Sequence, residues 1–271
     1  MSDLQKQSIG VFDSGIGGLT VVHELIKKFP HENIVYFGDT ARVPYGSKSD
    51  DTVRQYALED ARLLINFGVK MIVVACNTAS SVALDDIGRR YSIPTIGMIV
   101  PGARAAAIKS VNRKIGVIGT LATIGAQSYE KQLLYLDKNI RVYSQACPLF
   151  VPLAEEGWEN HRASQIIADE YLASLHKEEI DTLILGCTHY PMLKQVIQRS
   201  IGDGVHLIDS GQSAAHDVDV LLDELQLRNN SVQTPNYQFF VSDIPQRFKN
   251  IAERFLGMPI GKVTKIDASV H

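Results

Sequence analysis

Residues 8–14 read Ser-Ile-Gly-Val-Phe-Asp-Ser, and residues 114–120 repeat this pattern as Lys-Ile-Gly-Val-Ile-Gly-Thr. A second pair of segments is related in the same way, because Met-Ile-Val-Val-Ala-Cys-Asn-Thr at 71–78 resembles Thr-Leu-Ile-Leu-Gly-Cys-Thr-His at 182–189. The two pairs keep the same order along the chain and nearly the same spacing. This repetition predicts two related α/β halves.

The rest of the chain supports an α/β fold with mainly parallel sheets. Short apolar runs rich in Val and Ile alternate with segments of helical period, which is typical of βα units. Helical stripes occur within 53–65 and 166–175 and are expected to face a sheet. The predicted strands are 9–12, 34–37, 71–75, 95–99, 114–118, 141–145, 182–185 and 205–208. We expect 1–98 plus 210–271 to form a first domain and 99–209 a second, pseudo-symmetric one.

Composition restricts the classes of function. The chain of 271 residues has 27 Lys and Arg against 30 Asp and Glu, and neither sign forms a block typical of nucleic-acid or membrane binding. The first residues contain no apolar signal segment, and no apolar run approaches the roughly 18 residues of a membrane span. Three cysteines make no disulfide framework. We therefore expect a cytoplasmic protein with free thiols and small-molecule partners.

Two of the three cysteines follow strands of the repeated motifs. Ligands of parallel sheets bind beyond the carboxyl ends of the strands, where Cys76 and Cys187 are expected, one from each half. Each thiol is followed by side chains that can hydrogen-bond a ligand, and a helix starting near 80–83 is expected to lower the pKa of the first thiol. One buried cysteine is usually a small core residue. Two in repeated contexts indicate chemistry, whereas Cys147 is predicted to be a packed thiol.

Other motifs indicate a ligand edge and exclude some ligands. The segment 13–18, Asp-Ser-Gly-Ile-Gly-Gly, closes a strand and opens a helix, where backbone N–H groups favour an anion such as a carboxylate. It lacks the spacing of a dinucleotide or P-loop motif. In the loop 38–46 we expect the Tyr45 hydroxyl to reach a polar ligand, while Arg42 could pair with a ligand carboxylate or with Asp39. No Cys-x-x-Cys or His-x-x-x-His spacing indicates a metal site.

The ordered motifs closely resemble those of the glutamate racemases. They are Gly-Val-Phe-Asp-Ser-Gly-Ile-Gly-Gly, Gly-Asp-Thr-Ala-Arg-Val-Pro-Tyr-Gly, Ala-Cys-Asn-Thr-Ala, Cys-Pro-Leu-Phe-Val-Pro-Leu and Leu-Gly-Cys-Thr-His-Tyr-Pro. The resemblance implies a two-domain fold with an active site in the cleft, no pyridoxal phosphate or other cofactor, no metal, and a homodimer. It also implies an isomerase that supplies D-glutamate for peptidoglycan.

By matching motifs, the resemblance implies a role for each site residue. Cys76 serves the D side and Cys187 the L side as acid and base. Asp13 and His189 assist the thiols, either by exchanging protons or by holding the substrate ammonium. A supporting carboxylate maps to Glu155, with Glu156 beside it as the alternative. The implied substrate contacts are Asp13, Ser14, Tyr45, Gly46, Asn77, Thr78, Thr188 and His189.

The chemistry of racemisation explains why the site needs these types of residue. One residue must remove the Cα proton from one face while another delivers a proton to the opposite face, so one thiol is ionised and the other is not. Preorganised donors must stabilise the negative charge that develops on the substrate. Two alternatives remain, which are a racemase for aspartate or another acidic amino acid and a two-lobed amino-acid-binding module without catalysis.

Overall fold

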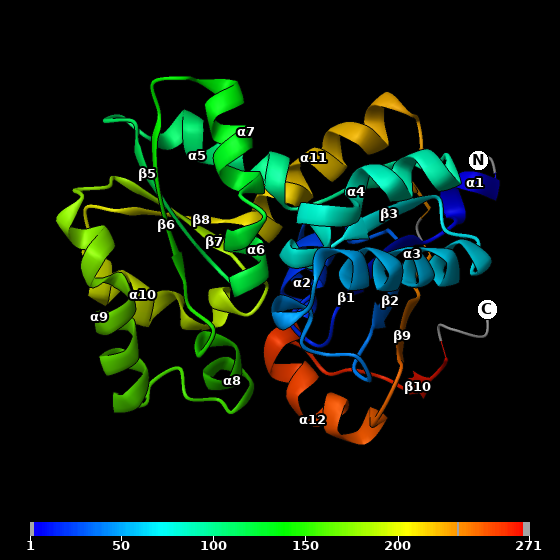
Figure 1. Ribbon diagram of the computed structural model, residues 1–271. Helices are drawn as coiled ribbons and strands as arrows, with labels where there is room; N and C mark the ends of the chain where they lie inside the picture. Colours follow the sequence, from blue (N-terminus) through cyan, green and yellow to red (C-terminus); the bar gives the residue numbers. More distant parts are fainter. Residues whose placement is uncertain (1–2, 232, 268–271) are drawn as a thin grey trace.

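The computed structural model describes residues 3–231 and 233–267, which form two parallel β-sheets covered by helices (Figure 1). The first sheet has the order β10-β9-β2-β1-β3-β4 and the second has the order β6-β5-β7-β8. The strands are β1 (Ile9–Asp13), β2 (Ile34–Gly38), β3 (Met71–Val74), β4 (Thr95–Ile96), β5 (Lys114–Gly119), β6 (Arg141–Ala146), β7 (Thr182–Gly186), β8 (His206–Asp209), β9 (Tyr237–Val241) and β10 (Val263–Lys265). The mixed α/β class with parallel sheets is confirmed.

The repeated segments occupy equivalent places in the two sheets. β1 lies between β2 and β3, and β5 lies between β6 and β7. Ile9 pairs with Met71 in the first sheet, and their counterparts Ile115 and Thr182 pair in the second. The prediction of two related halves is therefore confirmed at the level of strand register. The first sheet is extended beyond β2 by β9 and β10, which the sequence analysis did not predict.

Helices cover both faces of each sheet, which explains why the central strands are apolar throughout. In the first half α3 and α4 pack together on one face, while α2, α11 and α12 pack on the other. In the second half α5 packs with α7, and α9 packs with α10. The α-helices are α1 (Asp3–Lys6), α2 (Leu19–Lys28), α3 (Asp50–Asn66), α4 (Asn77–Tyr91), α5 (Ile99–Lys109), α6 (Leu121–Gly125), α7 (Ser128–Leu136), α8 (Phe150–Glu155), α9 (Arg162–Lys177), α10 (Lys194–Ile201), α11 (Ser210–Glu224) and α12 (Pro245–Leu256), and the 3₁₀ helices are η1 (Tyr45–Ser47) and η2 (Tyr190–Leu193).

The chain passes from the first sheet to the second after β4 and returns after β8. The predicted strand 95–99 is too long, because β4 ends at Ile96 and α5 begins at Ile99. Ser80 Oγ accepts a hydrogen bond from the Met98 N–H at 3.1 Å, so this backbone group is bonded away from the sheet. The chain therefore leaves the sheet edge at the crossing.

The predicted helical stripes are mostly buried. In α3, Val53, Ala57 and Leu64 lie in the core beneath the first sheet. In α9, Leu172 is buried, but Ile166 is 57% exposed and was wrongly assigned to the inner face. Ala168, one helical turn before Leu172, is the residue that packs inward.

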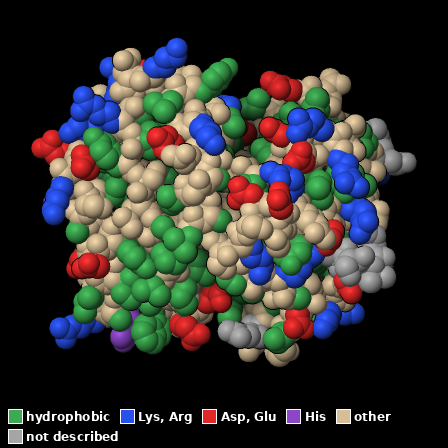
Figure 2. Space-filling view, viewed as in Figure 1, with side chains coloured by type: hydrophobic (Ala, Val, Ile, Leu, Met, Phe, Trp, Pro, Cys, Tyr) green, Lys and Arg blue, Asp and Glu red, His purple; other side chains and the backbone are tan. Residues whose placement is uncertain are grey.

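The surface carries a gathering of hydrophobic side chains over the part of the second half where Figure 1 places α8 and α9 (Figure 2). Leu149, Trp158 and Ile166 are exposed large hydrophobic residues of this segment. Within the described residues, no helix combines the length and apolarity that a bilayer crossing requires.

Candidate active site

A cavity lies where the carboxyl ends of the two sheets face each other. Its walls come from both halves. Cys76 follows β3 and Cys187 follows β7, as predicted, and they are 5% and 6% exposed. The lining residues are Ser14, Val43, Pro44, Tyr45, Gly46, Cys76, Asn77, Thr78, Thr120, Val151, Gly186, Cys187, Thr188 and His189.

Cys76 caps the start of a helix. Its Sγ accepts a hydrogen bond from the Ala79 N–H at 3.5 Å and lies 3.7 Å from Ser14 Oγ. The helix predicted near residue 80 in fact begins at Asn77. The expected lowering of the thiol pKa is wrong, because burial and the nearby Asp13 carboxylate raise the pKa of Cys76 to about 12 despite the hydrogen bond from the Ala79 N–H and the contact with Ser14.

Cys187 has a different neighbour. Its Sγ lies 3.8 Å from His189 Nδ1, and His189 Nε2 lies 3.0 Å from Glu155 Oε1. Burial by itself would lower the pKa of His189, but the contacts with Cys187 and Glu155 outweigh burial and raise it to about 10. The imidazole is therefore protonated at neutral pH. Of the two carboxylates considered from the sequence, Glu155 is the one that contacts His189.

Asp13 connects the two halves from the end of β1. Its buried carboxylate accepts hydrogen bonds from the Gly15 N–H at 3.0 Å and from Thr188 Oγ1, in the other half, at 3.3 Å. Burial raises the pKa of Asp13, against the opposing charge of His189. Asp13 is not among the residues that line the described cavity, but it bonds to Thr188, which does, and its charge acts on Cys76.

A glycine permits this contact between the halves. A Cβ atom on Gly17 would lie 2.3 Å from Thr188 Oγ1 and 2.4 Å from His189 Nδ1. Any larger residue at position 17 would push both side chains away from Asp13 and Cys187. Gly17 therefore sets how closely the two strand ends approach each other.

The other predicted substrate contacts also bond across the cleft. Thr78 Oγ1 lies 3.0 Å from Thr120 Oγ1 and 3.1 Å from Thr123 Oγ1, both in the second half. Asn77 Oδ1 accepts a hydrogen bond from the Tyr129 hydroxyl at 2.6 Å. A Cβ atom on Gly46 would lie 2.6 Å from Thr120 Cβ. The sequence analysis missed Thr120, although it aligns with Ser14 in the repeat and could have been found there.

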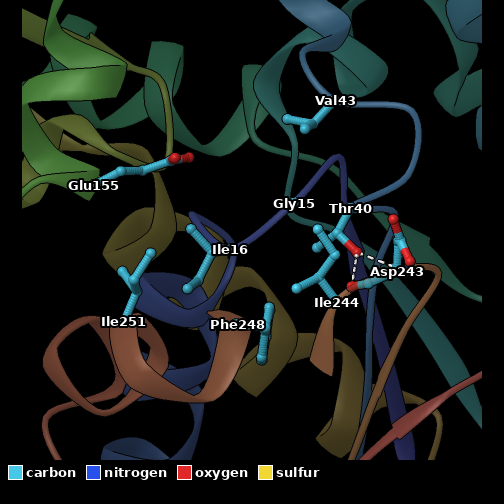
Figure 3. A pocket seen from close by; sticks show the side chains of 9 residues that line it. All are labelled: Gly15, Ile16, Thr40, Val43, Glu155, Asp243, Ile244, Phe248 and Ile251. Atoms are coloured by element: carbon cyan, nitrogen blue, oxygen red, sulfur yellow. Dashed lines mark hydrogen bonds between the residues drawn. The ribbon is translucent and has the colours of Figure 1, made fainter. Parts of the chain in front are cut away.

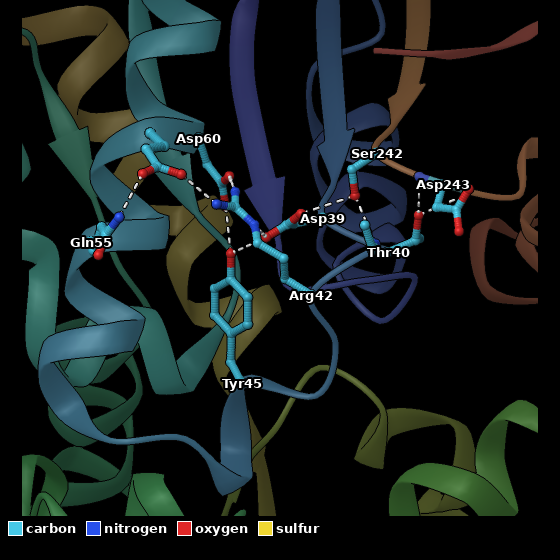
Figure 4. Close-up of polar contacts among 10 residues, drawn as sticks. Asp39, Thr40, Arg42, Tyr45, Gln55, Asp60, Ser242 and Asp243 are labelled. Atoms are coloured by element: carbon cyan, nitrogen blue, oxygen red, sulfur yellow. Dashed lines mark hydrogen bonds and ion pairs between the residues drawn. The ribbon is translucent and has the colours of Figure 1, made fainter. Parts of the chain in front are cut away.

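Tyr45 is among the residues that line the cavity, but its hydroxyl is bound to carboxyl groups of the protein (Figure 4). The hydroxyl contacts Asp39, and it lies 2.9 Å from Asp60 Oδ2. The expectation that it reaches a ligand is therefore wrong. Arg42 pairs with Asp39 at 2.6 Å, with Asp60 at 2.9 Å and with Glu59, so its charge is satisfied within this buried cluster.

Cys147 is fully buried after β6, and its Sγ lies 3.7 Å from the Gln145 carbonyl oxygen. It is not among the residues that line the cavity, and the prediction of a packed thiol is confirmed. Among the described residues, no group of three or more His, Cys, Asp or Glu side chains is placed to hold a metal ion.

A second cavity adjoins the first and shares Val43 with it (Figure 3). Glu155 faces it from the second half, and Phe248 and Ile251 face it from α12. The sequence analysis missed α12 in spite of clear signals. Pro245 occupies its first turn, and Gly257 follows its last residue.

Comparison with known proteins adds four observations. The sequence pattern of the family described as Asp/Glu/Hydantoin racemase matches residues 17–218. A glutamate racemase of Geobacter metallireducens is 47% identical over 260 residues, covering 96% of each chain. A crystal structure of glutamate racemase from Francisella tularensis in complex with D-glutamate has a TM-score of 0.93 at 41% identity, covering 98% of this chain and 100% of that one. A glutamate racemase from Thermus thermophilus in complex with β-chloro-D-alanine has a TM-score of 0.89 at 42% identity, covering 97% and 98%.

Proposed function

The chain belongs to the Asp/Glu/hydantoin racemase family, and we propose that it interconverts L-glutamate and D-glutamate with Cys76 and Cys187 as its two bases. It is thus an isomerase. The observation that carries this proposal is that two buried thiols, at equivalent strand ends of two related halves, line the same cavity.

The reaction from the L isomer begins at Cys187. Its thiolate takes the Cα proton, and the electron pair left on Cα is delocalised into the adjacent carboxyl group of the substrate. The Cys76 thiol then delivers its proton to the opposite face and becomes the thiolate. One proton leaves and one arrives, so the product differs only in configuration, and the D isomer reacts through the same steps in reverse.

The lining residues supply donors for the two carboxylates of the substrate. Ser14 and Thr188 offer hydroxyl groups, and the N-terminus of α4 offers backbone N–H groups and its helix dipole to a carboxylate. We retain Gly46, Asn77 and Thr78 as substrate contacts because they line the cavity. Asp13 is assigned a positioning role through Thr188, and His189 with Glu155 is assigned to the Cys187 thiol.

The proposed reaction requires neither pyridoxal phosphate nor a metal. Pyridoxal phosphate is bound in enzymes through a lysine Schiff base, and the lining residues that the structure describes include no lysine. We expect full activity after exhaustive chelation and dialysis. Activity that is abolished by chelation and restored by adding a metal would contradict the proposal.

The proposal is tested by assaying the purified chain on glutamate and aspartate with no cofactor added. We expect circular dichroism to show racemisation of glutamate, and NMR in deuterated water to show deuterium entering at Cα. Equal rates on the two substrates would remove the assignment to glutamate. Absence of exchange on either substrate would leave a binding module without catalysis.

We further propose a homodimer, as the resemblance implies, and the exposed hydrophobic residues over α8 and α9 support it. Analytical ultracentrifugation should show a dimer at assay concentrations, and a fully active monomer would contradict this.

We also propose a division into two domains, 1–98 plus 210–271 and 99–209. It is supported by the places where the chain crosses between the two sheets.

We propose a cytoplasmic role in supplying D-glutamate for peptidoglycan. If so, depletion of the enzyme should make growth depend on added D-glutamate.

A further inference from the structure

Helix α12 belongs to the C-terminal part of the chain, outside the residues 17–218 that match the family pattern. It packs against α2 in the first half, yet two of its side chains reach into the second half. Arg254 donates hydrogen bonds from Nη2 to the carbonyl oxygens of Ala154 at 2.6 Å and Glu155 at 2.8 Å. These carbonyls are at the end of α8, where the last carbonyls have no N–H partner further along the helix, although that of Ala154 also accepts the Gly157 N–H at 3.2 Å.

The segment that follows α8 is fitted closely around this guanidinium group. Gly157 has a φ of +74°, and a Cβ atom there would lie 2.6 Å from Arg254 Nη1. The Arg254 Nε also lies 3.2 Å from a carboxylate oxygen of Glu159. Arg254 therefore holds the backbone of residues 154–159 through both carbonyl and carboxylate contacts, which fixes the backbone from which the Glu155 side chain extends.

The next residue of α12 contacts the partner of Glu155. The buried Phe255 ring meets the His189 imidazole edge-on, with 5.5 Å between ring centroids and 78° between planes. Adjacent residues of one helix thus contact both members of the Glu155–His189 pair, whereas the Sγ atom of Cys76 contacts Ser14 and Ala79.

We propose that Arg254 is a positioning residue for the proton chemistry of Cys187 and not for that of Cys76. By capping α8 it keeps the Glu155 carboxylate at hydrogen-bonding distance from His189, which in turn contacts the Cys187 thiol. The inference rests on the proposed two-base function. It adds a residue that supports only the Cys187 side and that lies outside residues 17–218, which match the family pattern.

Ordinary racemisation rates cannot test this side-specific role. L- and D-glutamate have equal free energy, so the equilibrium constant is unity, and every variant has the same kcat/KM in both directions. The test therefore requires variants that retain one thiol and a substrate that needs only one base. In a glutamate analogue with chlorine on Cβ, removal of the Cα proton lets that electron pair form a Cα–Cβ double bond while chloride leaves.

The experiment introduces Arg254→Ala into Cys76→Ser and, separately, into Cys187→Ser. We expect chloride release from the L isomer by Cys76→Ser to fall about 10- to 100-fold, because small displacements of catalytic groups cost this much. Release from the D isomer by Cys187→Ser should change less than about twofold. Arg254→Lys should restore part of the loss, since an ammonium can still donate to one carbonyl. Arg104→Ala, which breaks the exposed Arg104–Asp217 contact between α5 and α11, is the matched control and should alter neither release.

An equal loss in both backgrounds would overturn the positioning role while leaving the two-base function intact. If neither single-thiol variant releases chloride, the two-base function itself fails. A second measurement does not depend on turnover. NMR titration of the His189 imidazole should give a lower pKa in Arg254→Ala than in the unaltered chain, because Glu155 is no longer held against it. An unchanged pKa would also contradict the proposal.

Discussion

The Cys76 side and the Cys187 side of the site have the same backbone and opposite electrostatic surroundings. Cys76 follows β3, which pairs with β1, and Cys187 follows β7, which pairs with β5. The two strand pairs have matching register. Burial and the Asp13 carboxylate raise the pKa of Cys76 and favour its neutral thiol, whereas Cys187 faces the His189 imidazole, whose pKa is raised to about 10. The two thiols thus differ in the charge of their nearest ionisable neighbour, a carboxylate for Cys76 and an imidazole for Cys187.

The difference arises at a few equivalent positions. Asp13 ends β1 where Gly119 ends β5, and Thr78 aligns with His189 in the second repeated segment. A third pair follows β2 and β6, where the buried Asp39 corresponds to the buried Cys147. Repetition of one backbone places the two thiols at equivalent strand ends, and the different residues at neighbouring positions give each thiol different charged partners.

The largest expected effect comes from removing either thiol. Cys76→Ser and Cys187→Ser should each lower the rate of racemisation about 10²- to 10⁴-fold, because a hydroxyl is a far weaker acid than a thiol. With the chloro-substituted analogue, Cys76→Ser should eliminate from the L isomer and Cys187→Ser from the D isomer. Chloride release measures both, and a shared preference for one enantiomer would reverse the assignment of sides.

Cys147→Ser is the control for those variants, because this thiol is buried away from the cavity lining. It should keep most of the glutamate racemase activity in the circular dichroism assay. A loss as large as that of Cys76→Ser would mean that the site extends to the end of β6.

The next effect concerns the carboxylate that distinguishes the Cys187 side. Glu155→Gln removes the charge that faces His189 at 3.0 Å and should lower kcat/KM about 10- to 100-fold, which is the range for a hydrogen bond to a charged group. It should also lower the pKa of His189 in an NMR titration. Glu156→Gln is the matched control, and equal losses in both variants would show that contact with His189 is not what matters.

A smaller effect concerns the buried cluster of Asp39, Arg42, Tyr45, Glu59 and Asp60 in the first half. Asp39 occupies the position that is equivalent to Cys147 in the second half. Burial and the negative charge of Asp39 raise the pKa of Asp60 well above its ordinary value of 3.8. The unfolded chain therefore releases this proton at lower pH than the folded chain, and stability falls as pH rises from about 3.8 to the raised pKa. Urea unfolding should show the stability of the unaltered chain falling relative to Asp60→Asn over this range. A difference that is constant with pH would contradict an Asp60 that is protonated in the fold.

The smallest effect separates the thiols by stability rather than by rate. Cys76 is the N-cap of α4, and serine is a much preferred residue at that position. Cys76→Ser should therefore raise the free energy of unfolding by about 0.5 to 1 kcal/mol while the activity is lost. Cys187→Ser has no capping contact to improve and should show no such gain in denaturant unfolding.

The sequence sufficed to place both thiols because strand period and internal repetition are local properties that survive folding. It did not give the protonation state of Cys76, since the pKa depends on burial and on the distance to Asp13, which lies on another strand. The Tyr45 hydroxyl was misassigned because its partner Asp60 comes from a different helix. The contact between Arg254 and Glu155 joins residues 99 positions apart, and no sequence pattern in either segment predicts it.

The pairing of β9 with β2 has a consequence for the growing chain on the ribosome. The second sheet is built from one continuous stretch, 114–209, whereas Ile34 in β2 must pair with Tyr237, which is synthesised about 200 residues later. Until then the edge of β2 has free backbone groups, which favour pairing with other chains. We expect translation products that stop before residue 237 to aggregate through this edge. Synthesis of residues 237–256 is thus the step that both covers the edge of β2 and brings Arg254 to α8.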